Sequence, residues 1–259
     1  MESKAKPHNE GYEQVMIAII TGASSGIGEE FTKQVDKLGF DEIWLVARRE
    51  EKLKNLSYKL KTRARIIALD LCKEESILKI KNEIKGKKIG LLINSAGRGT
   101  SKYFKESSLD DDMKTLKLNI LALVGLTRAL LPYFSKNGII LNISSVSAFM
   151  PQPKFAVYSA SKSFVLSFSR SIRREFKDIR VSVLCPSIVD TEFIEKSDNK
   201  SKIKDLGKED LEKMVKKSIK YMGKKDIITT SPTSKLILLI SKIIPHSLIM
   251  KIEKLMKIY

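Results

Sequence analysis

The stretch VMIAIITGASSGIG, residues 15–28, decides the fold class of this chain. Its first part, Val15–Ile20, is rich in β-branched residues, which is typical of a buried strand. A glycine-rich turn follows, Thr21–Gly28, and then a segment, Gly28–Leu38, with apolar residues at helical spacing. Such a turn directs backbone N–H groups and a helix N-terminus at a phosphate with no side chain in the way. A plain tight turn is the alternative, but the order strand, turn, helix favours a nucleotide site.

Strand and helix patterns alternate along the rest of the chain, which predicts βαβ units and a parallel sheet. Further strands are expected at Ile43–Val46, Arg65–Leu69, Ile89–Ile93, Ile139–Ile143, Ile179–Leu184 and Ile227–Thr230. Further helices are expected at Glu50–Leu60, Ser76–Ile84, Leu109–Phe134, Ala156–Phe176, Leu211–Met222 and, broken at Pro245, over 234–257. We therefore predict an α/β fold with one doubly wound domain of Rossmann type, whose parallel sheet of about seven strands has helices on both faces. This domain would span residues 15–230, after a flexible N-terminus, 1–14, and before a basic, apolar-faced helical extension, 231–259.

The composition excludes several classes of protein. With 259 residues, 42% of them hydrophobic, the chain can bury one sizeable core, so global disorder is excluded. Two cysteines and two histidines are too few for a disulfide framework or a histidine-based zinc site, and no metal is expected. Because no signal-peptide pattern and no long apolar run stand out, a cytoplasmic protein is the expectation.

The charge is strongly basic, with a net value of +18. Half of it lies in residues 196–259, which hold sixteen lysines and seven acidic residues. Such an excess favours nucleic acid, an anionic membrane or an acidic ligand as a partner. No helix-turn-helix, zinc or RNP-type motif accompanies the charge, so no specific nucleic acid is expected.

The end of the second expected strand, where residues 46–49 read VARR, indicates which dinucleotide is bound. A carboxylate at this place would accept a hydrogen bond from the ribose 2′-hydroxyl of NAD. Here Ala47 takes that place and Arg48 follows, and a guanidinium favours the 2′-phosphate of NADP. The hydroxyls of Ser24 and Ser25 could add to the phosphate contacts, so NADP(H) is the expected cofactor. Two solvated arginines at a helix start are the alternative.

Tyr158 and Lys162 are spaced i and i+4 and would share one face of the helix expected at 156–176. An ordinary tyrosine has a pKa near ~10, and a nearby ammonium together with an oxidised nicotinamide would lower it. Tyr158 would then serve as a general acid for reducing a carbonyl, or as a base for the reverse. Ser145, at the end of the fifth expected strand, would hydrogen-bond the carbonyl oxygen. A surface Tyr/Lys pair and a serine that caps a helix are the alternatives.

These residues belong to a longer pattern. The chain resembles the short-chain dehydrogenase/reductase family, and within it an NADP-preferring bacterial-type oxidoreductase group similar to hydroxysteroid and 3-ketoacyl reductases. The resemblance rests on Thr21–Gly28, Asp70, Asn94–Gly97, Asn119, Ser145, Tyr158, Lys162 and Pro186–Thr191. It implies an NADP(H)-dependent oxidoreductase that reduces a ketone or aldehyde to an alcohol, or catalyses the reverse, with a Ser-Tyr-Lys site. The small-molecule substrate is expected to be apolar: acyl, steroid-like or another small carbonyl.

The resemblance also implies roles for single residues. Asn119 would hold Lys162 through a water and pass protons outward, and Lys162 would bind the nicotinamide ribose and lower the pKa of Tyr158. The implied catalytic set is Asn119, Ser145, Tyr158 and Lys162. The implied cofactor-binding set is Gly22, Ser24, Ser25, Gly26, Ile27, Gly28, Arg48, Arg49, Asp70, Leu71, Asn94, Ala96, Gly97, Tyr158, Lys162, Pro186, Ile188 and Thr191.

Two positions depart from the family's pattern. Ser95 stands where the family usually has the second Asn of Asn-Asn-Ala-Gly, and little damage is expected from this small polar residue. Ser187 stands where a glycine usually follows Pro186, and serine is less free than glycine to take a positive φ. That places the local backbone, and the contact with the carboxamide, in question. Neither departure touches Ser145, Tyr158 or Lys162, so an active enzyme is predicted rather than a relative that has lost catalysis.

The C-terminal segment, 234–259, suggests an alternative role. Apolar residues at helical spacing alternate there with five lysines, so the segment could lie in an anionic interface and make the protein peripheral at the inner membrane face. The other interpretation is that these faces pack on the enzyme or across a subunit boundary. From the resemblance, a homodimer or homotetramer is expected, with the helices at 109–134 and 156–176 pairing with their copies.

Overall fold

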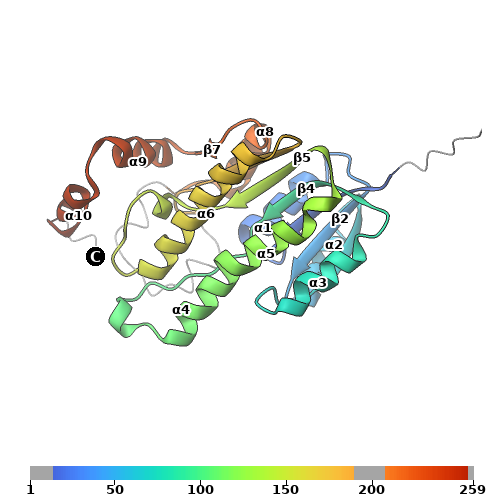
Figure 1. Ribbon diagram of the computed structural model, residues 1–259, viewed down its shortest axis with the longest axis horizontal. Helices are drawn as coiled ribbons and strands as arrows, with labels where there is room; N and C mark the ends of the chain where they lie inside the picture. Colours follow the sequence, from blue (N-terminus) through green and yellow to red (C-terminus); the bar gives the residue numbers. More distant parts are fainter. Residues whose placement is uncertain (1–13, 190–207, 256–259) are drawn as a thin grey trace, which may run out of the picture.

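A seven-stranded parallel sheet forms the centre of the computed structural model, which describes residues 14–189 and 208–255 (Figure 1). The strand order is β3-β2-β1-β4-β5-β6-β7, so the chain winds outward from β1 in both directions. The strands are β1 (Met16–Thr21), β2 (Glu42–Ala47), β3 (Arg63–Ala68), β4 (Lys88–Asn94), β5 (Phe134–Ile143), β6 (Ile179–Leu184) and β7 (Ile227–Ile228). The predicted doubly wound α/β fold is confirmed.

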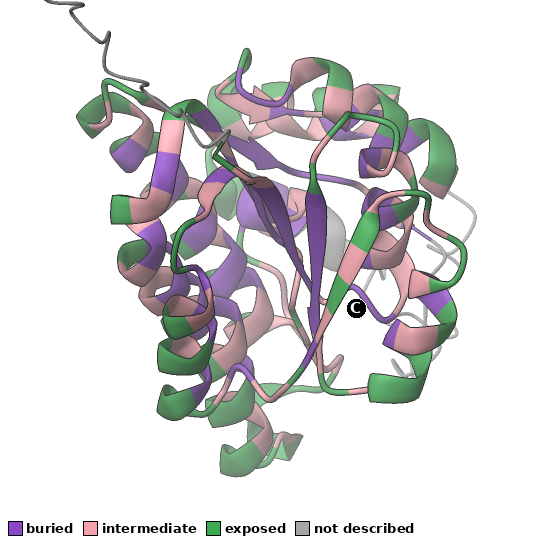
Figure 2. Ribbon diagram, turned by 90° about the vertical axis from the view of Figure 1, so that its right-hand side faces the viewer, coloured by how far each residue is buried: buried purple, intermediate pink, exposed green. Residues whose placement is uncertain are grey.

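Helices cover both faces of the sheet, and Figure 2 shows the buried strands running between the two helical layers. One layer consists of α1 (Gly26–Val35), α2 (Glu50–Ser57) and α8 (Leu211–Tyr221). The other consists of α3 (Glu74–Glu83), α5 (Leu123–Leu130) and α6 (Ala156–Glu175), with α4 (Leu109–Leu116) leading into α5. The chain continues through α9 (Pro232–Ile243) and α10 (His246–Leu255).

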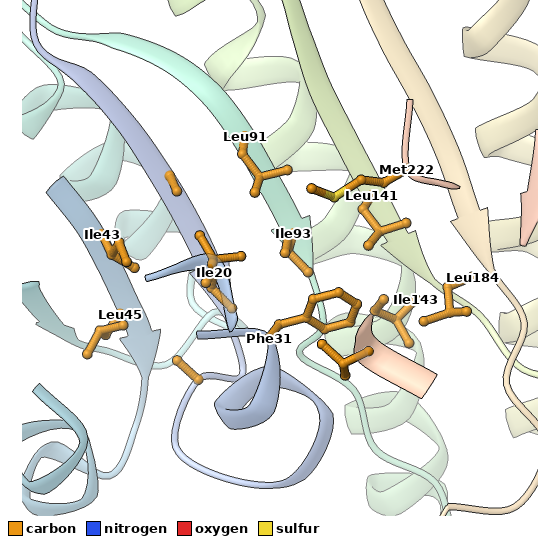
Figure 3. Close-up of a cluster of buried hydrophobic side chains, with 14 of the residues drawn as sticks. Ile20, Phe31, Ile43, Leu45, Leu91, Ile93, Leu141, Ile143, Leu184 and Met222 are labelled. Atoms are coloured by element: carbon orange, nitrogen blue, oxygen red, sulfur yellow. The ribbon is translucent and has the colours of Figure 1, made fainter. Parts of the chain in front are cut away.

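Two hydrophobic layers follow from the alternation of side chains along each strand. In β1, Ala18 and Ile20 face the layer of α1 and α8, whereas Ile17 and Ile19 face the layer of α3 and α5. Figure 3 shows Phe31 of α1 reaching across the first of these layers among the aliphatic side chains of the central strands. Because both faces of the sheet are covered, the central strands β1, β2 and β4 contain continuous buried apolar runs, whereas the edge strand β3 is partly exposed.

The run Leu109–Tyr133 is helical throughout, and by length and composition alone it could cross a membrane. Its side chains Leu126 and Leu130 are buried against the sheet, as in the core helix of a soluble protein, which passes the same test. The single helix predicted here is interrupted by a π-helical turn, Lys117–Ala122, in which each hydrogen bond spans one residue more. The following strand, β5, begins at Phe134 rather than at Ile139, because Phe134 pairs with Ile89 of β4 across a register shift.

The predicted C-terminal extension consists of the two helices that Figure 1 shows at one end of the molecule. Helix α9 begins with a capping box, in which Ser231 and Ser234 satisfy each other's backbone N–H groups. Ile237 and Leu238 of α9 pack on a small cluster that includes Phe149 and Val165. The extension is therefore attached to the domain by apolar contacts.

Candidate active site

A cavity of about 1130 Å³ opens at the carboxyl ends of the strands, which is where ligands bind in doubly wound sheets. The glycine-rich turn and Arg48 line one end of it, and Ser145, Tyr158 and Lys162 line the other. Further predicted cofactor residues also line it: Ser24, Ser25, Gly26, Ile27, Gly28, Arg49, Asp70, Leu71, Ala96, Gly97, Pro186 and Ile188. One continuous cavity thus joins the residues predicted to bind the coenzyme to those predicted to do chemistry.

The glycine-rich turn is packed so closely that two of its glycines cannot be replaced without a shift of backbone. Gly22 has a φ of 69°, and a Cβ there would lie 2.9 Å from the backbone nitrogen of Ala96. A Cβ on Gly28 would lie 2.3 Å from the carbonyl oxygen of Gly22. The turn therefore brings bare backbone and the N-terminus of α1 to the cavity, which suits a pyrophosphate.

Arg49 rather than Arg48 makes the contacts to the two serines of the turn. Its Nε donates to Ser24 Oγ at 3.1 Å, and a terminal nitrogen donates to Ser25 Oγ at 2.5 Å. Arg48 is exposed at the same end of the cavity. Ala47 ends β2 in place of a carboxylate, so two guanidinium groups and two hydroxyls gather where a ribose 2′-substituent would lie.

The other end of the cavity holds the three residues predicted to be catalytic. Tyr158 and Lys162 lie one turn apart on α6, with the Lys162 ammonium 5.7 Å from the centre of the tyrosine ring. Lys162 is buried and donates to the Ile143 carbonyl oxygen at 2.9 Å. Ser145, just after β5, is hydrogen-bonded to Tyr158 and also accepts from the backbone N–H of Ser147 at 3.1 Å. The sequence placed these side chains together correctly.

Burial dominates the ionisation of this site. It raises the pKa of Tyr158 to about 12, even though the hydrogen bond from Ser145 acts to lower it. It also lowers the pKa of Lys162 to about 8. Within the protein itself the pKa of Tyr158 is therefore raised rather than lowered, because loss of solvation outweighs the hydrogen bond with Ser145.

Asn119 lies on the π-helical turn and is held from three sides. Its Oδ1 accepts from the backbone N–H of Arg98, and its Nδ2 donates to the Arg98 carbonyl oxygen and to Ser161 Oγ, each at 2.9 Å. The amide side chain thus ties α4–α5 to the strand β4 loop and to α6. Gly97 is close to both Asn119 and Lys162, since a Cβ on it would lie 3.4 Å from Asn119 Oδ1 and from Lys162 Nζ.

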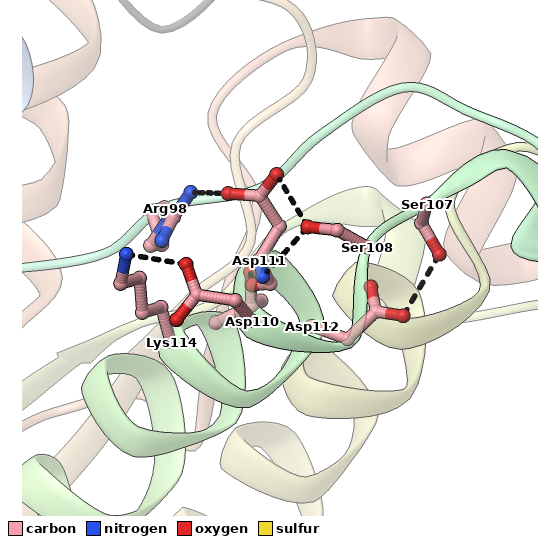
Figure 4. Close-up of polar contacts among 8 residues, drawn as sticks. Arg98, Ser107, Ser108, Asp110, Asp111, Asp112 and Lys114 are labelled. Atoms are coloured by element: carbon pink, nitrogen blue, oxygen red, sulfur yellow. Dashed lines mark hydrogen bonds and ion pairs between the residues drawn. The ribbon is translucent and has the colours of Figure 1, made fainter.

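The segment after Gly97 is also fixed by charge. Figure 4 shows Arg98 pointing at Asp111 of α4, and the two groups are 2.7 Å apart. Ser108 caps α4 by accepting from the Asp111 backbone N–H at 3.2 Å. The start of α4 and the cavity wall are therefore held against each other.

The resemblance implies that Asn94 lies on the adenosine ribose side and braces the sheet, and the structure shows the bracing. Asn94 is buried between β5 and α5, where its Nδ2 donates to Asn142 Oδ1 at 2.8 Å and to Thr127 Oγ1 at 3.2 Å. Asn94 braces the sheet and its neighbours Ala96 and Gly97 line the cavity. Ser95 lines the cavity without disturbing this arrangement, since its backbone N–H donates to Thr21 Oγ1 at 3.0 Å.

Ser187 is part of a polar cluster that the sequence did not predict. The Glu209 carboxylate accepts from the backbone N–H of Ser187 at 2.8 Å, from Ser187 Oγ at 2.9 Å and from Thr230 Oγ1. Ser231 Oγ donates to Ser187 Oγ at 3.4 Å. We call Ser187, Glu209, Thr230 and Ser231 the Glu209 cluster. Among the described residues the only non-glycine positions with positive φ are Asn137 and Lys154, so Ser187 needs no left-handed backbone.

Thr191 and helix α9 complete the comparison of the cavity with the sequence predictions. Thr191, expected at the carboxamide, lies outside the described residues. Thr233 and Ile237 of α9 line the cavity, although the sequence placed α9 in a separate extension. The Ser231–Ser234 capping motif was the available sign that this helix starts at a fixed place.

A family model for short chain dehydrogenases matches residues 16–202 of this chain. The chain belongs to the short-chain dehydrogenase family. This dehydrogenase is therefore an oxidoreductase, and a nicotinamide dinucleotide is its coenzyme. The cavity fits such a group, because the backbone cradle at Gly22 and Gly28 lies at one end and the Ser145, Tyr158 and Lys162 side chains lie at the other.

Among curated proteins, this dehydrogenase is 35% identical over 218 residues to the very-long-chain 3-oxoacyl-CoA reductase of Rattus norvegicus, covering 80% of this chain and 68% of that protein. It is 30% identical over 215 residues to the 17-beta-hydroxysteroid dehydrogenase type 3 of Mus musculus, covering 79% and 68%. Among solved structures, the short-chain dehydrogenase from Sphingobium yanoikuyae in complex with NADPH is similar, with a TM-score of 0.75 and 26% identity. That match covers 83% of this chain and 87% of the other.

Proposed function

We propose that this dehydrogenase uses NADPH to reduce an apolar ketone or aldehyde to an alcohol. The observation that carries the proposal is that one cavity contains both a cationic end and an end with Ser145, Tyr158 and Lys162. Arg48, Arg49 and the serines of the turn stand at the ribose end, and Ser145, Tyr158 and Lys162 stand at the other. The cationic end suits the 2′-phosphate that distinguishes NADP from NAD.

The reaction needs a proton at the carbonyl oxygen as that atom gains electrons. When bound, the reduced coenzyme supplies the hydride that the carbonyl carbon receives. Ser145 donates a hydrogen bond to the oxygen and Tyr158 gives up its phenolic proton to it. The charged Lys162 then favours the phenolate left behind. The raised pKa of Tyr158 supports reduction as the direction at neutral pH, because the phenol stays protonated and can donate.

Apolar side chains in the cavity wall support an apolar substrate. Val146, Phe155, Val189 and Ile237 all line the cavity. The curated relatives act on 3-oxoacyl-CoA and, by name, on hydroxysteroids. We propose 3-oxoacyl thioesters as the first substrates to test, with a steroid-like ketone as the second.

A coenzyme titration tests the cationic end of the cavity. NADPH and NADH are titrated by calorimetry into the wild type and into the Arg48→Ala and Arg49→Ala variants. We expect NADPH to bind more tightly, and each variant to weaken NADPH at least about tenfold, or ~1.4 kcal/mol, while NADH changes little. Arg49→Ala should have the larger effect, since it also releases Ser24 and Ser25.

Arg174→Ala is the matched control, because Arg174 is exposed near the end of α6. Equal binding of the two dinucleotides by the wild type would overturn the NADP preference. NADPH-dependent turnover of a 3-oxoacyl thioester that falls about 10²–10⁴-fold in Tyr158→Phe would support the substrate class, and turnover of neither ketone class would contradict it.

A further inference from the structure

The two faces of α9 differ in what they contact. Ile237 and Leu238 pack on the cluster with Phe149 and Val165. On the other side, Leu236, Leu239 and Ile243 are 56%, 54% and 70% exposed. Because these three are spaced three and four apart, they form one apolar stripe along the helix. Leu248 of α10 is 48% exposed. We call Leu236, Leu239, Ile243 and Leu248 the α9 stripe.

The charged residues of α9 and α10 are mostly lysines. Lys235, Lys242 and Lys251 are exposed on the same two helices. In the sequence, residues 231–259 contain five lysines and a single acidic residue, Glu253. Apolar side chains flanked by unbalanced lysines are what an anionic bilayer surface binds, through buried apolar area and attraction to the headgroups.

The α9 stripe has a fixed position relative to the rest of the domain. The capping box at Ser231 fixes the start of α9, and the contacts of Ile237 and Leu238 fix its rotation. The same helix contributes Thr233 and Ile237 to the cavity wall. A surface that received the stripe would therefore lie beside the cavity.

We infer that α9 and α10 seat this dehydrogenase on an anionic lipid bilayer through the α9 stripe and its lysines. A second copy of the chain is the other occupant to consider. A two-fold contact brings the same patch of both copies together, so the lysines of this patch would lie near their own copies, with Glu253 as the single acidic side chain in residues 231–259 to offset them. The charge therefore favours lipid over a second copy.

Vesicle co-sedimentation of the full chain tests the inference. The probes are vesicles of phosphatidylcholine alone and of phosphatidylcholine mixed equally with phosphatidylglycerol. We expect the wild type to pellet with the anionic vesicles, much less with the neutral ones, and less at ~1 M salt, where the screening length falls to about 3 Å. The combined variant Leu236→Gln, Leu239→Gln, Ile243→Gln should lower the partition coefficient at least about tenfold.

Matched control variants carry the same kinds of substitution at exposed sites outside α9 and α10. Leu78→Gln changes a leucine of α3 that is 58% exposed, and it should bind vesicles like the wild type. Lys235→Gln, Lys242→Gln, Lys251→Gln should weaken anionic binding, whereas Lys37→Gln, Lys59→Gln, Lys85→Gln removes the same charge from exposed sites elsewhere and should weaken it less. Melting temperature and NADPH affinity show that each variant is folded.

Wild-type protein that does not pellet with anionic vesicles would overturn the inference. So would equal pelleting of the wild type and the stripe variant. If the wild type did not bind vesicles and the stripe variant had a different sedimentation coefficient, the α9 stripe would instead contact a second copy of the chain. Vesicle binding is measured without substrate. Absence of vesicle binding would therefore not contradict the proposed reaction, and absence of the reaction would not contradict vesicle binding.

Discussion

Tyr158 and Lys162 lie one turn apart on α6, and burial shifts the pKa of each toward its neutral form. A tyrosine with a pKa of about 12 stays protonated at neutral and mildly alkaline pH. A lysine with a pKa of about 8 loses its charge at mildly alkaline pH. The pH dependence of reduction should therefore report Lys162 rather than Tyr158.

We expect kcat/KM for carbonyl reduction to be level below about pH 8 and to fall as the pH rises through the pKa of Lys162. The sign follows because the charged ammonium is the form that stabilises the phenolate, and it is lost on the alkaline side. Lys162→Arg keeps its charge and should remove this fall, at some cost in rate. If kcat/KM of Lys162→Arg fell at alkaline pH as in the wild type, the fall would belong to another group.

Tyr158→Phe should reduce kcat by about 10²–10⁴-fold with NADPH binding retained.

The proximity of the three proposed catalytic residues could be predicted because they form short motifs on regular elements. Tyr158 and Lys162 share a helix face, and Ser145 ends a strand. The Glu209 cluster could not be predicted, since its members are far apart in sequence and a lone glutamate has no pattern. The hydrogen-bond partners of Asn94 could not be predicted for a related reason: the sequence shows a polar residue at a strand end but not which way its amide points.

At the scale of elements, apolar periodicity predicted the strands and helices well. The bounds of β6 were predicted as observed, Ile179–Leu184. Periodicity could not show the π-helical turn at Lys117–Ala122, because one extra residue per turn barely alters the apolar pattern. It also missed the start of β5, where Asn137 takes a φ of 64° and the Asn-Gly pair has the pattern of a turn between elements.

Glu42 connects three elements of the sheet. Its carboxylate accepts from Trp44 Nε1 at 3.0 Å on β2 and from Lys87 before β4, and it lies 3.5 Å from Arg63 of β3. Burial alone would raise the pKa of Glu42, but the hydrogen bonds from Lys87 and Trp44 outweigh it, so the pKa lies below the ordinary 4.5. The carboxylate is therefore stabilising above that value, and this contribution is lost as the pH falls through the folded-state pKa.

We expect Glu42→Gln to lower the free energy of unfolding at pH 7 by about 1.5–3 kcal/mol, the scale of a hydrogen bond to a charged group. The difference from the wild type should shrink as the pH falls below 4.5. Denaturant unfolding at several pH values, followed by the fluorescence of buried Trp44, measures it. Glu51→Gln, at an exposed site on α2, should change little, and a deficit that persists in acid would contradict the assignment.

At the scale of the whole molecule, α4, α5 and α6 lie together on one side of the sheet (Figure 1). Leu109, Met113 and Leu121 of the 109–133 run and Phe164 of α6 are exposed there. Apolar side chains on neighbouring helices favour burial against another surface. The homodimer or homotetramer in which these helices pair with their copies stays a prediction.

We predict that Leu121→Asp dissociates such an assembly or weakens it at least about tenfold, because it places a charge in an apolar contact. Sedimentation velocity over a range of concentrations measures the change. Leu78→Asp, on the exposed side of α3, is the control and should sediment like the wild type. A wild type that stays monomeric at high concentration would remove the basis for this interface.

The Glu209 cluster has a consequence for how the two ends of the molecule communicate. Ser231 caps the helix that bears the α9 stripe, and it is hydrogen-bonded to Ser187, beside Pro186 and Ile188 at the cavity. Any free energy that passes through this contact acts in both directions by thermodynamic linkage. If binding of α9 to a bilayer raised the affinity for the coenzyme through this contact, bound coenzyme would raise the affinity for the bilayer by the same factor. The enzyme would then bind the reduced coenzyme most tightly at a membrane, and bind the membrane most tightly with the reduced coenzyme in place.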